Sequence, residues 1–158
     1  MLYRIRHAPD LPGWKDHFKT INLEWLNRYF TVTEADLDQL GHPERILKDG
    51  GRILFVTLQD EVIGALALVL EKSGAVELAK MGVLAAYQKK GAGTFLMDAA
   101  IQEAIEMKAS PLYLETVDVL VPAIKLYASA GFVRVGSPHI HPKFGRTVFR
   151  MEWNKSLE

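Results

Sequence analysis

The segment Tyr87–Thr94, YQKKGAGT, decides the fold because it joins an apolar run to a helical pattern. Residues 76–84, VELAKMGVL, favour a strand, and residues 94–108, TFLMDAAIQEAIEMK, place their apolar side chains at helical spacing. A helix that starts directly after a glycine-rich turn exposes unpaired backbone N–H groups, here beside two lysines. These residues alone leave two interpretations open, a simple turn with solvated lysines or a binding site for an anion.

Several properties of this segment suit a pyrophosphate. The start of a helix carries a partial positive charge, and phosphate groups bind there readily. Gly91 and Gly93 let the backbone approach a ligand closely, and Lys89 and Lys90 add positive charge. The Gly-Lys-Ser/Thr ending of nucleoside-triphosphate loops and the Gly-x-Gly-x-x-Gly turn of dinucleotide-binding folds are both missing, which disfavours those two ligand classes.

The rest of the chain alternates between the two periods of regular secondary structure. Apolar residues at every second position predict strands, and apolar residues at every third or fourth position predict helices. In chain order, we expect a strand at 2–8, one or two helices over 13–30, a short helix that begins with a capping box of Thr33 and Asp36, a helical turn at 42–48, strands at 52–59, 61–72 and 75–84, the helix at 94–108, a strand at 112–117, a helix at 122–130, and closing strands at 132–135 and 146–153 that a loop connects.

This order predicts an α/β (α+β) fold in one domain over residues 1–158. We expect a mixed, mostly antiparallel central sheet of about six to seven strands, with a central β-α-β crossover and helices on both faces. The chain has the usual length of one domain, and no linker or internal repeat divides it.

Composition excludes several classes of function. Lys plus Arg and Asp plus Glu number 19 each, and a net charge of zero argues against nucleic-acid binding. The absence of cysteine excludes disulfides, thiolate metal sites and a covalent Cys-acyl intermediate. The longest apolar run, VIGALALVL at 62–70, is too short to span a bilayer, and the N-terminus lacks the apolar core of a signal peptide. We therefore expect a cytoplasmic protein without membrane partners.

A second motif lies further along the chain, and with the first it carries a resemblance. Taken alone, Tyr127 in LYASAGF at 126–132 is more typical of core packing than of catalysis. Together, however, QKKGAGT at 88–94 and PAIKLYASAGF at 122–132 resemble the GNAT-type N-acetyltransferase superfamily, which has an acyl-CoA N-acyltransferase fold. The Gln/Arg-x-x-Gly-x-Gly/Ala loop of that superfamily is matched at Gln88, Gly91 and Gly93, and its Leu-Tyr-x-x-x-Gly-Phe signature at Leu126, Tyr127, Gly131 and Phe132.

The resemblance implies acetyl-CoA as a co-substrate and assigns residues to it. It implies that strand backbone at 81–83 pairs with the pantetheine arm and that the loop N–H groups hold the pyrophosphate, while Thr116 lies near the thiol. The implied cofactor-binding residues are Met81, Gly82, Val83, Gln88, Lys89, Lys90, Gly91, Ala92, Gly93, Thr94 and Thr116.

The implied reaction is direct acetyl transfer to a primary amine in a ternary complex. Tyr127 would act as the general acid that protonates the departing thiolate, and the N–H of Met81 or Val83 would stabilise the oxyanion. Glu77 is the leading candidate for the general base, because strict alternation would place residues 77, 79, 81 and 83 on one strand face. Glu115 is the second candidate, and a water relay or a merely solvated Glu77 stays open.

Other residues and partners are less constrained. The acceptor could be a small molecule or a peptide, and a non-catalytic acyl-CoA-binding sensor or docking module is the alternative function. His139 and His141 are expected in a surface loop, and we expect no metal site because no third ligand accompanies them. The aromatic residues that could line an acceptor pocket, or simply fill the core, are Trp14, Trp25, Tyr29 and Phe30. A homodimer through a C-terminal edge strand is also left open.

Overall fold

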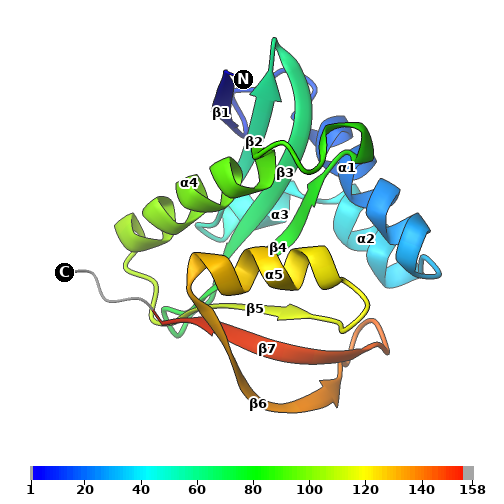
Figure 1. Ribbon diagram of the computed structural model, residues 1–158, viewed down its shortest axis with the longest axis vertical. Helices are drawn as coiled ribbons and strands as arrows, with labels where there is room; N and C mark the ends of the chain where they lie inside the picture. The colour runs from blue at the N-terminus through cyan, green and yellow to red at the C-terminus, as the bar shows by residue number, and fades with distance from the viewer. Residues whose placement is uncertain (1, 155–158) are drawn as a thin grey trace.

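The computed structural model describes residues 2–154, which form a seven-stranded mixed sheet with helices on both faces (Figure 1). The strand order is β1-β2-β3-β4-β5-β7-β6, and β4 and β5 are the parallel pair in this otherwise antiparallel sheet. This confirms the predicted fold class. The elements are β1 (Tyr3–His7), α1 (Trp14–Tyr29), α2 (Glu34–Gly41), α3 (Glu44–Lys48), β2 (Arg52–Leu58), β3 (Glu61–Leu70), β4 (Val76–Val83), the 3-10 turn η1 (Ala85–Tyr87), α4 (Ala92–Glu106), β5 (Leu112–Thr116), α5 (Val121–Ala130), β6 (Phe132–Ile140) and β7 (Thr147–Trp153).

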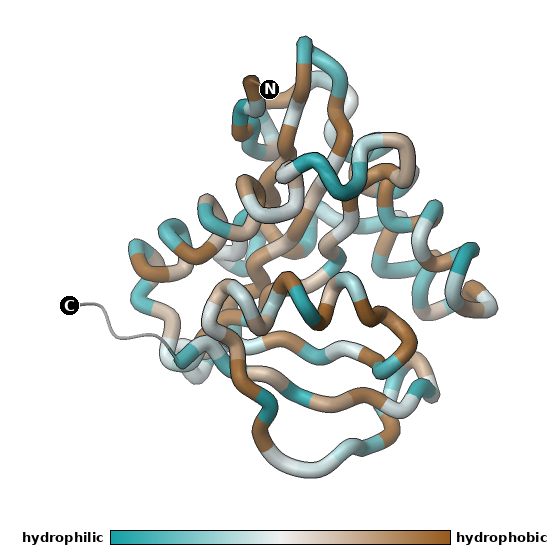
Figure 2. The backbone as a smooth tube through the Cα atoms, in the orientation of Figure 1, coloured by the Kyte–Doolittle hydropathy of each residue, from teal (hydrophilic) through white to brown (hydrophobic). Residues whose placement is uncertain are grey.

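Two hydrophobic cores lie on the two faces of the sheet. One contains Leu96 and Met97 of α4 with Leu54 and Val56 of β2, whereas the other contains Phe18 and other residues of α1 with the alternate positions of β2. Strand β2 therefore reads as a continuous apolar run, because helices cover it on both sides. Figure 2 shows these inner strands mainly in hydrophobic colours, while the turns of α4 alternate between hydrophobic and hydrophilic. No helix within residues 2–154 has the length and apolarity to cross a membrane.

The sheet splits between β4 and β5. The two strands pair only at Val76–Leu112 and Glu77–Tyr113, and beyond these positions they diverge. Helix α4 connects them, as the predicted crossover requires. The split leaves the β5-facing edge of the second half of β4 without a strand partner.

Strand β4 also contains a bulge, which corrects one expectation. The register of β3 against β4 shifts between Ala65 and Ala67, and Lys80 adopts a left-handed backbone conformation with φ of 54°. Met81 and Val83 consequently pack against the α4-side core, which also contains Val76 and Leu78. The expectation that residues 77, 79, 81 and 83 share one face is therefore wrong, because the extra residue of the bulge reverses the alternation.

The C-terminal hairpin is longer than expected. Strand β6 continues to Ile140, although the sequence predicted a strand only over 132–135, and His139 thus lies on a strand and not in a loop. Because β6 is an edge strand, Pro138 can sit in it without removing a ladder hydrogen bond that the sheet needs. A register shift between Val135 and His139 accommodates the residues that resemble a loop.

An ion pair ties the N-terminal helices to this hairpin. The predicted capping box is confirmed, since Thr33 and Asp36 exchange side-chain and backbone hydrogen bonds at the start of α2. The buried Asp36 also accepts two hydrogen bonds from Arg146, at 2.9 and 2.6 Å. Burial opposes the ionisation of Asp36, but the hydrogen bonds from Arg146 and Thr33 outweigh it and lower the pKa to about 2. The guanidinium stacks on Phe30, 4.6 Å from the ring centre.

We expect Asp36→Asn to lower the free energy of unfolding by about 3 kcal/mol at pH 7, because Arg146 loses its buried partner. The control is Asp38→Asn on the same helix, whose pair with Arg45 at 3.2 Å is exposed and should change stability by less than about 1 kcal/mol. Urea denaturation measures both. Since ionised Asp36 stabilises the fold above its ordinary pKa, the difference should shrink as the pH falls toward 2. Equal losses in both variants would contradict this role of Asp36.

Candidate active site

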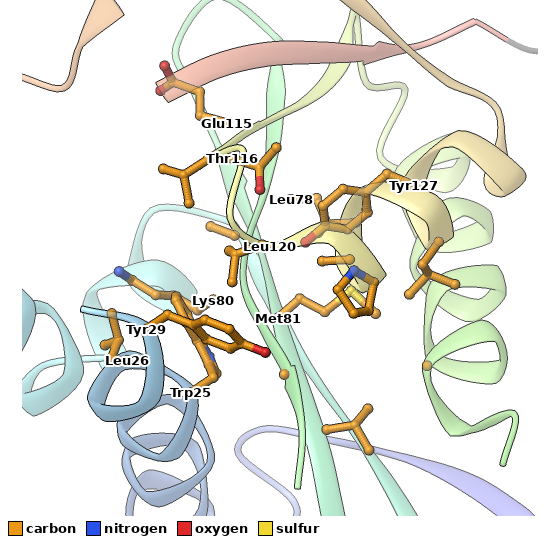
Figure 3. Close-up of a pocket in the computed structure, with 18 of the residues that line it drawn as sticks. Trp25, Leu26, Tyr29, Leu78, Lys80, Met81, Glu115, Thr116, Leu120 and Tyr127 are labelled. Carbon is orange, nitrogen blue, oxygen red and sulfur yellow. The ribbon is translucent and has the colours of Figure 1, made fainter. Parts of the chain in front are cut away.

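A cleft of about 450 Å³ opens where β4 and β5 diverge. Residues of α1, β4, the segment before α4, β5, α5 and the β6–β7 connection line it. Figure 3 shows Tyr127, Leu120 and Thr116 on one side and Trp25, Tyr29 and Lys80 on the other, with Met81 between them. The split in the sheet therefore gathers residues from both ends of the chain.

The unpaired edge of β4 forms one wall of this cleft. Met81, Gly82 and Val83 line it, and these are the residues to which the resemblance assigned the pantetheine arm. A Cβ at Gly82 would lie 2.6 Å from Cδ1 of Trp25, so any side chain at this position would collide with the indole ring. Trp25 is held in place because its Nε1 donates a hydrogen bond of 3.0 Å to the buried Asn22.

The glycine-rich segment forms a cradle of backbone N–H groups. Lys89 and Gly91 have φ of 63° and 92°, and such left-handed residues turn successive N–H groups toward one point. Across residues 2–154, no carbonyl or side chain accepts a hydrogen bond from the N–H groups of 89–94. These groups span the approach to α4 and its first turn, and Figure 2 shows the chain directly before this helix as hydrophilic. The cradle fits an anionic group such as a pyrophosphate.

The predicted members of this segment are not equivalent. Lys90 does not line the cleft, and its carbonyl accepts a hydrogen bond of 2.6 Å from Tyr3. Ala92 is buried in the α4-side core, so only its backbone can serve a ligand. The predicted residues that line the cleft are Gln88, Lys89, Gly91, Gly93 and Thr94.

Tyr127 reaches the cleft from α5. Its ring packs against Phe132 with 6.2 Å between the ring centres, and its hydroxyl points into the cleft (Figure 3). Burial raises the pKa of the Tyr127 phenol to about 12, so the group stays protonated at neutral pH. It can therefore donate a proton or a hydrogen bond to a bound group.

Thr116 offers a second polar atom to a ligand. The residue is buried, lines the cleft, and its Oγ1 has no hydrogen-bond partner within residues 2–154. Buried hydroxyl groups are rarely left without a partner. An orphaned polar atom at this point fits the cofactor position that the resemblance assigned to Thr116.

Glu77 reaches the cleft from the opposite face of the sheet. Its strand neighbours Val76 and Leu78 face the α4-side core, so alternation directs Glu77 to the α1 side. Its carboxylate makes no hydrogen bond or ion pair with any described residue. Burial, and then the nearby charges of Glu115 and Glu71, raise the pKa of Glu77 to about 7. A carboxylate with this pKa is suited to accept a proton near neutral pH.

The other predicted residues divide between cleft and core. Glu115 lines the cleft but already contacts His139 at 2.7 Å, which makes it less available as a base than Glu77. His141 lines the cleft, whereas Trp14 belongs to the α1-side core. The aromatic residues that do line the cleft are Trp25, Tyr29 and Phe30. No group of three metal-ligating side chains occurs in the described part of the chain.

Sequence reasoning missed Lys80, Phe144 and Arg146, all of which line the cleft. Lys80 lies inside a strand, and an interpretation based on strict alternation does not reveal the bulge there. Phe144 and Arg146 lie in a connection rich in glycine and proline, and only the ion pair to Asp36 brings them to the site. No local signal in the sequence could have found them.

The comparisons with known proteins agree with this geometry. The model of the Acetyltransferase (GNAT) family matches residues 17–132. An uncharacterised N-acetyltransferase of Schizosaccharomyces pombe is 30% identical over 156 residues, which cover 94% of each chain. A GNAT family acetyltransferase from Staphylococcus aureus has a TM-score of 0.80 at 18% identity, covering 97% of this chain and 100% of its own.

A second solved structure carries the co-substrate. The GNAT family acetyltransferase from Elizabethkingia anophelis, described with acetyl-CoA bound, has a TM-score of 0.69 at 16% identity and covers 97% of this chain and 98% of its own. These two structures support the fold, and the family match covers most of the described chain. The split sheet, the N–H cradle and the matched sequences together lead to one conclusion: the protein is an acetyltransferase that belongs to the GNAT family.

Proposed function

We propose that the protein transfers the acetyl group of acetyl-CoA to a primary amine by direct attack in a ternary complex. One observation carries the proposal. Glu77 and Tyr127 reach the same cleft from opposite faces of the sheet, and the pKa is about 7 for the first and about 12 for the second. Near neutral pH, Glu77 can therefore accept a proton, while Tyr127 is protonated and can donate one.

The residues that would hold acetyl-CoA follow from the unpaired backbone of the cleft. The N–H groups of 89–94 would bind the pyrophosphate. The edge of Met81–Val83, which has no strand partner and where Gln88 Nε2 donates a hydrogen bond of 2.8 Å to the Val83 carbonyl, would pair with the amides of the pantetheine arm. Thr116 Oγ1 would gain the partner that it lacks. When bound, the thioester supplies an acetyl group that is activated toward attack by an amine.

The acceptor nitrogen loses two protons during the reaction. An ammonium acceptor has a pKa of about 10, so Glu77 removes its first proton and passes it to solvent. The N–C bond forms first, and the backbone N–H of Met81 or Val83 would stabilise the oxyanion that results. The C–S bond then breaks as the carbonyl re-forms. Tyr127 protonates the thiolate and is restored by the second proton that the nitrogen loses.

The shape of the acceptor side favours a small amine over a protein surface. Helix α1 and the β6–β7 connection both line this side of the cleft. The pair between Asp36 and Arg146 holds them together, and the aromatic rings of Phe30 and Phe144 flank the same guanidinium. A folded protein would have to separate these elements to present a lysine, whereas a small molecule would not.

We expect Gly91→Glu to lower the affinity for acetyl-CoA by about 100-fold or more, because a carboxylate in the cradle repels the pyrophosphate. The matched control is Gly74→Glu in the β3–β4 turn. Both glycines have positive φ, 92° and 97°, and no heavy atom within 3.5 Å of a built Cβ, so backbone strain and charge change are alike. Calorimetric titration measures the affinities. Equal binding by both variants would show that the segment is only a turn.

We expect Tyr127→Phe to lower kcat by about 100-fold or more while acetyl-CoA binding is unchanged, because the thiolate loses its proton donor. Tyr87→Phe is the control, since that hydroxyl is exposed and bonds to Glu61. Free thiol release measures turnover. Unchanged turnover would remove Tyr127 from the mechanism, and binding without any turnover in the wild type would favour the non-catalytic module.

We expect Glu77→Gln to abolish the rise of kcat/KM with a midpoint near pH 7, whereas Glu115→Gln should keep the rise but move its midpoint to lower pH, because the charge of Glu115 helps raise the pKa of Glu77. Stability provides an independent readout. Because the folded-state pKa is raised above its ordinary value of 4.5, ionised Glu77 destabilises the fold above pH 7 and has no effect below about pH 4. Glu77→Gln should therefore stabilise the protein at pH 8 by up to about 3 kcal/mol and leave it unchanged at pH 4. Stabilisation at both pH values would mean that Glu77 does not titrate as described.

A further inference from the structure

Lys80 gives the acceptor side of the cleft a positive charge without a counter-ion. The lining residues with a permanent positive charge are Lys80, Lys89 and Arg146. Arg146 is paired with Asp36, and Lys89 belongs to the N–H cradle. Across residues 2–154, no carboxylate lies within ion-pair distance of the Lys80 ammonium, whose Nζ instead lies 4.7 Å from the ring centre of Phe144.

The backbone at Lys80 indicates that this side chain is used. A φ of 54° is disfavoured for any residue other than glycine, asparagine or aspartate, and it costs about 1 kcal/mol or more. Burial lowers the pKa of Lys80, so its position also costs solvation. A lysine that is strained and partly desolvated at a cleft is best explained by a ligand that contacts it.

Glu77 gives the same strand an opposite charge, also without a partner. Three residues of a strand span about 10 Å, and the two side chains influence each other without forming an ion pair. The charged groups around them are satisfied elsewhere: Asp36 by Arg146, Glu115 by His139, and Glu71 by a hydrogen bond from Tyr113. Lys143, on the β6–β7 connection, is exposed to solvent.

We propose that the acceptor is a small amino acid whose free carboxylate binds Lys80 and whose amine faces Glu77. This inference rests on the proposed function and names its substrate class. A zwitterion compensates both lone charges at once, and neither charge needs a further group from the protein. Figure 3 shows Lys80 beside Tyr29 and Leu26 on the α1 side, where Trp25 also lies, so an apolar side chain of the acceptor has an aromatic wall to contact.

The same arrangement disfavours two other classes of amine. A peptide N-terminus carries an amide in place of the carboxylate, so Lys80 would stay unpaired. A polyamine would bring a second positive charge toward Lys80, which repels it. Leaving a buried charge unpaired reduces binding by about 10- to 100-fold.

The test compares the common L-amino acids with their amides and their decarboxylated amines as acceptors, by release of free thiol from acetyl-CoA. The amino acids should have kcat/KM values about 10- to 100-fold above those of the matched amides and amines, mainly through a lower KM. Lys80→Met should remove this preference without abolishing turnover of the amides, and Lys80→Arg should keep part of it. Lys143→Met, the same charge change on the exposed connection, removes only a longer-range attraction and should leave most of the preference intact.

The possible results distinguish a failure of the carboxylate site from a failure of the proposed acetyl transfer. Amides or simple amines that match or exceed the amino acids in the wild type would overturn the carboxylate site while leaving acetyl transfer in place. The same holds if Lys80→Met keeps the full preference. If no amine releases thiol although calorimetry detects acetyl-CoA binding, the proposed function fails and the amino-acid site fails with it. The comparison of amino acids with amides and amines in the wild type tests the carboxylate site even if Lys80→Met does not fold.

Discussion

The pairing of β4 with β5 at only two positions is the constraint on which the active site depends. Had the parallel pair continued, the backbone of Met81–Val83 would be bonded within the sheet and the two faces would be separated. Because the strands diverge, the edge of β4 is free for a ligand, and the gap joins the two sides of the sheet. Glu77 from one side and Tyr127 from the other therefore line the same cleft, although Tyr127 belongs to the α4-side core and Glu77 does not.

The electrostatics of the cleft follow from this gap. The side chains at the rim of the cleft are surrounded partly by apolar core residues and partly by bulk water. Charged groups there are therefore partly desolvated. Burial and the neighbouring carboxylates raise the pKa of Glu77, whereas burial lowers that of Lys80. Both changes mean that the charged forms are less stable in the cleft than in water. A ligand with complementary charges would stabilise the charged forms of both residues. This is the physical basis of the proposed acceptor site.

Most of the fold could be predicted because its signals are local. The glycine-rich turn before an amphipathic helix, the capping box of Thr33 and Asp36, and the apolar run of β2 each act within a few residues. The predictions that were wrong concern features that depend on distant partners. The bulge at Lys80 exists only in the register of β4 against β3, and the length of β6 depends on its edge position, where Pro138 is tolerated.

The sequence by itself determined the order of the elements, the glycine-rich turn at Gly91 and Gly93 before a helix, and the presence of Tyr127 in a motif of the GNAT family. Only the tertiary structure decided which side chains meet in the cleft. Alternation along β4 predicts one face for Glu77, Met81 and Val83, but the bulge divides them and places Lys80 at the cleft. Arg146 reaches the same place through its ion pair with Asp36, 110 residues away in the chain. Such contacts arise from packing between segments far apart in sequence, and local patterns carry no information about them.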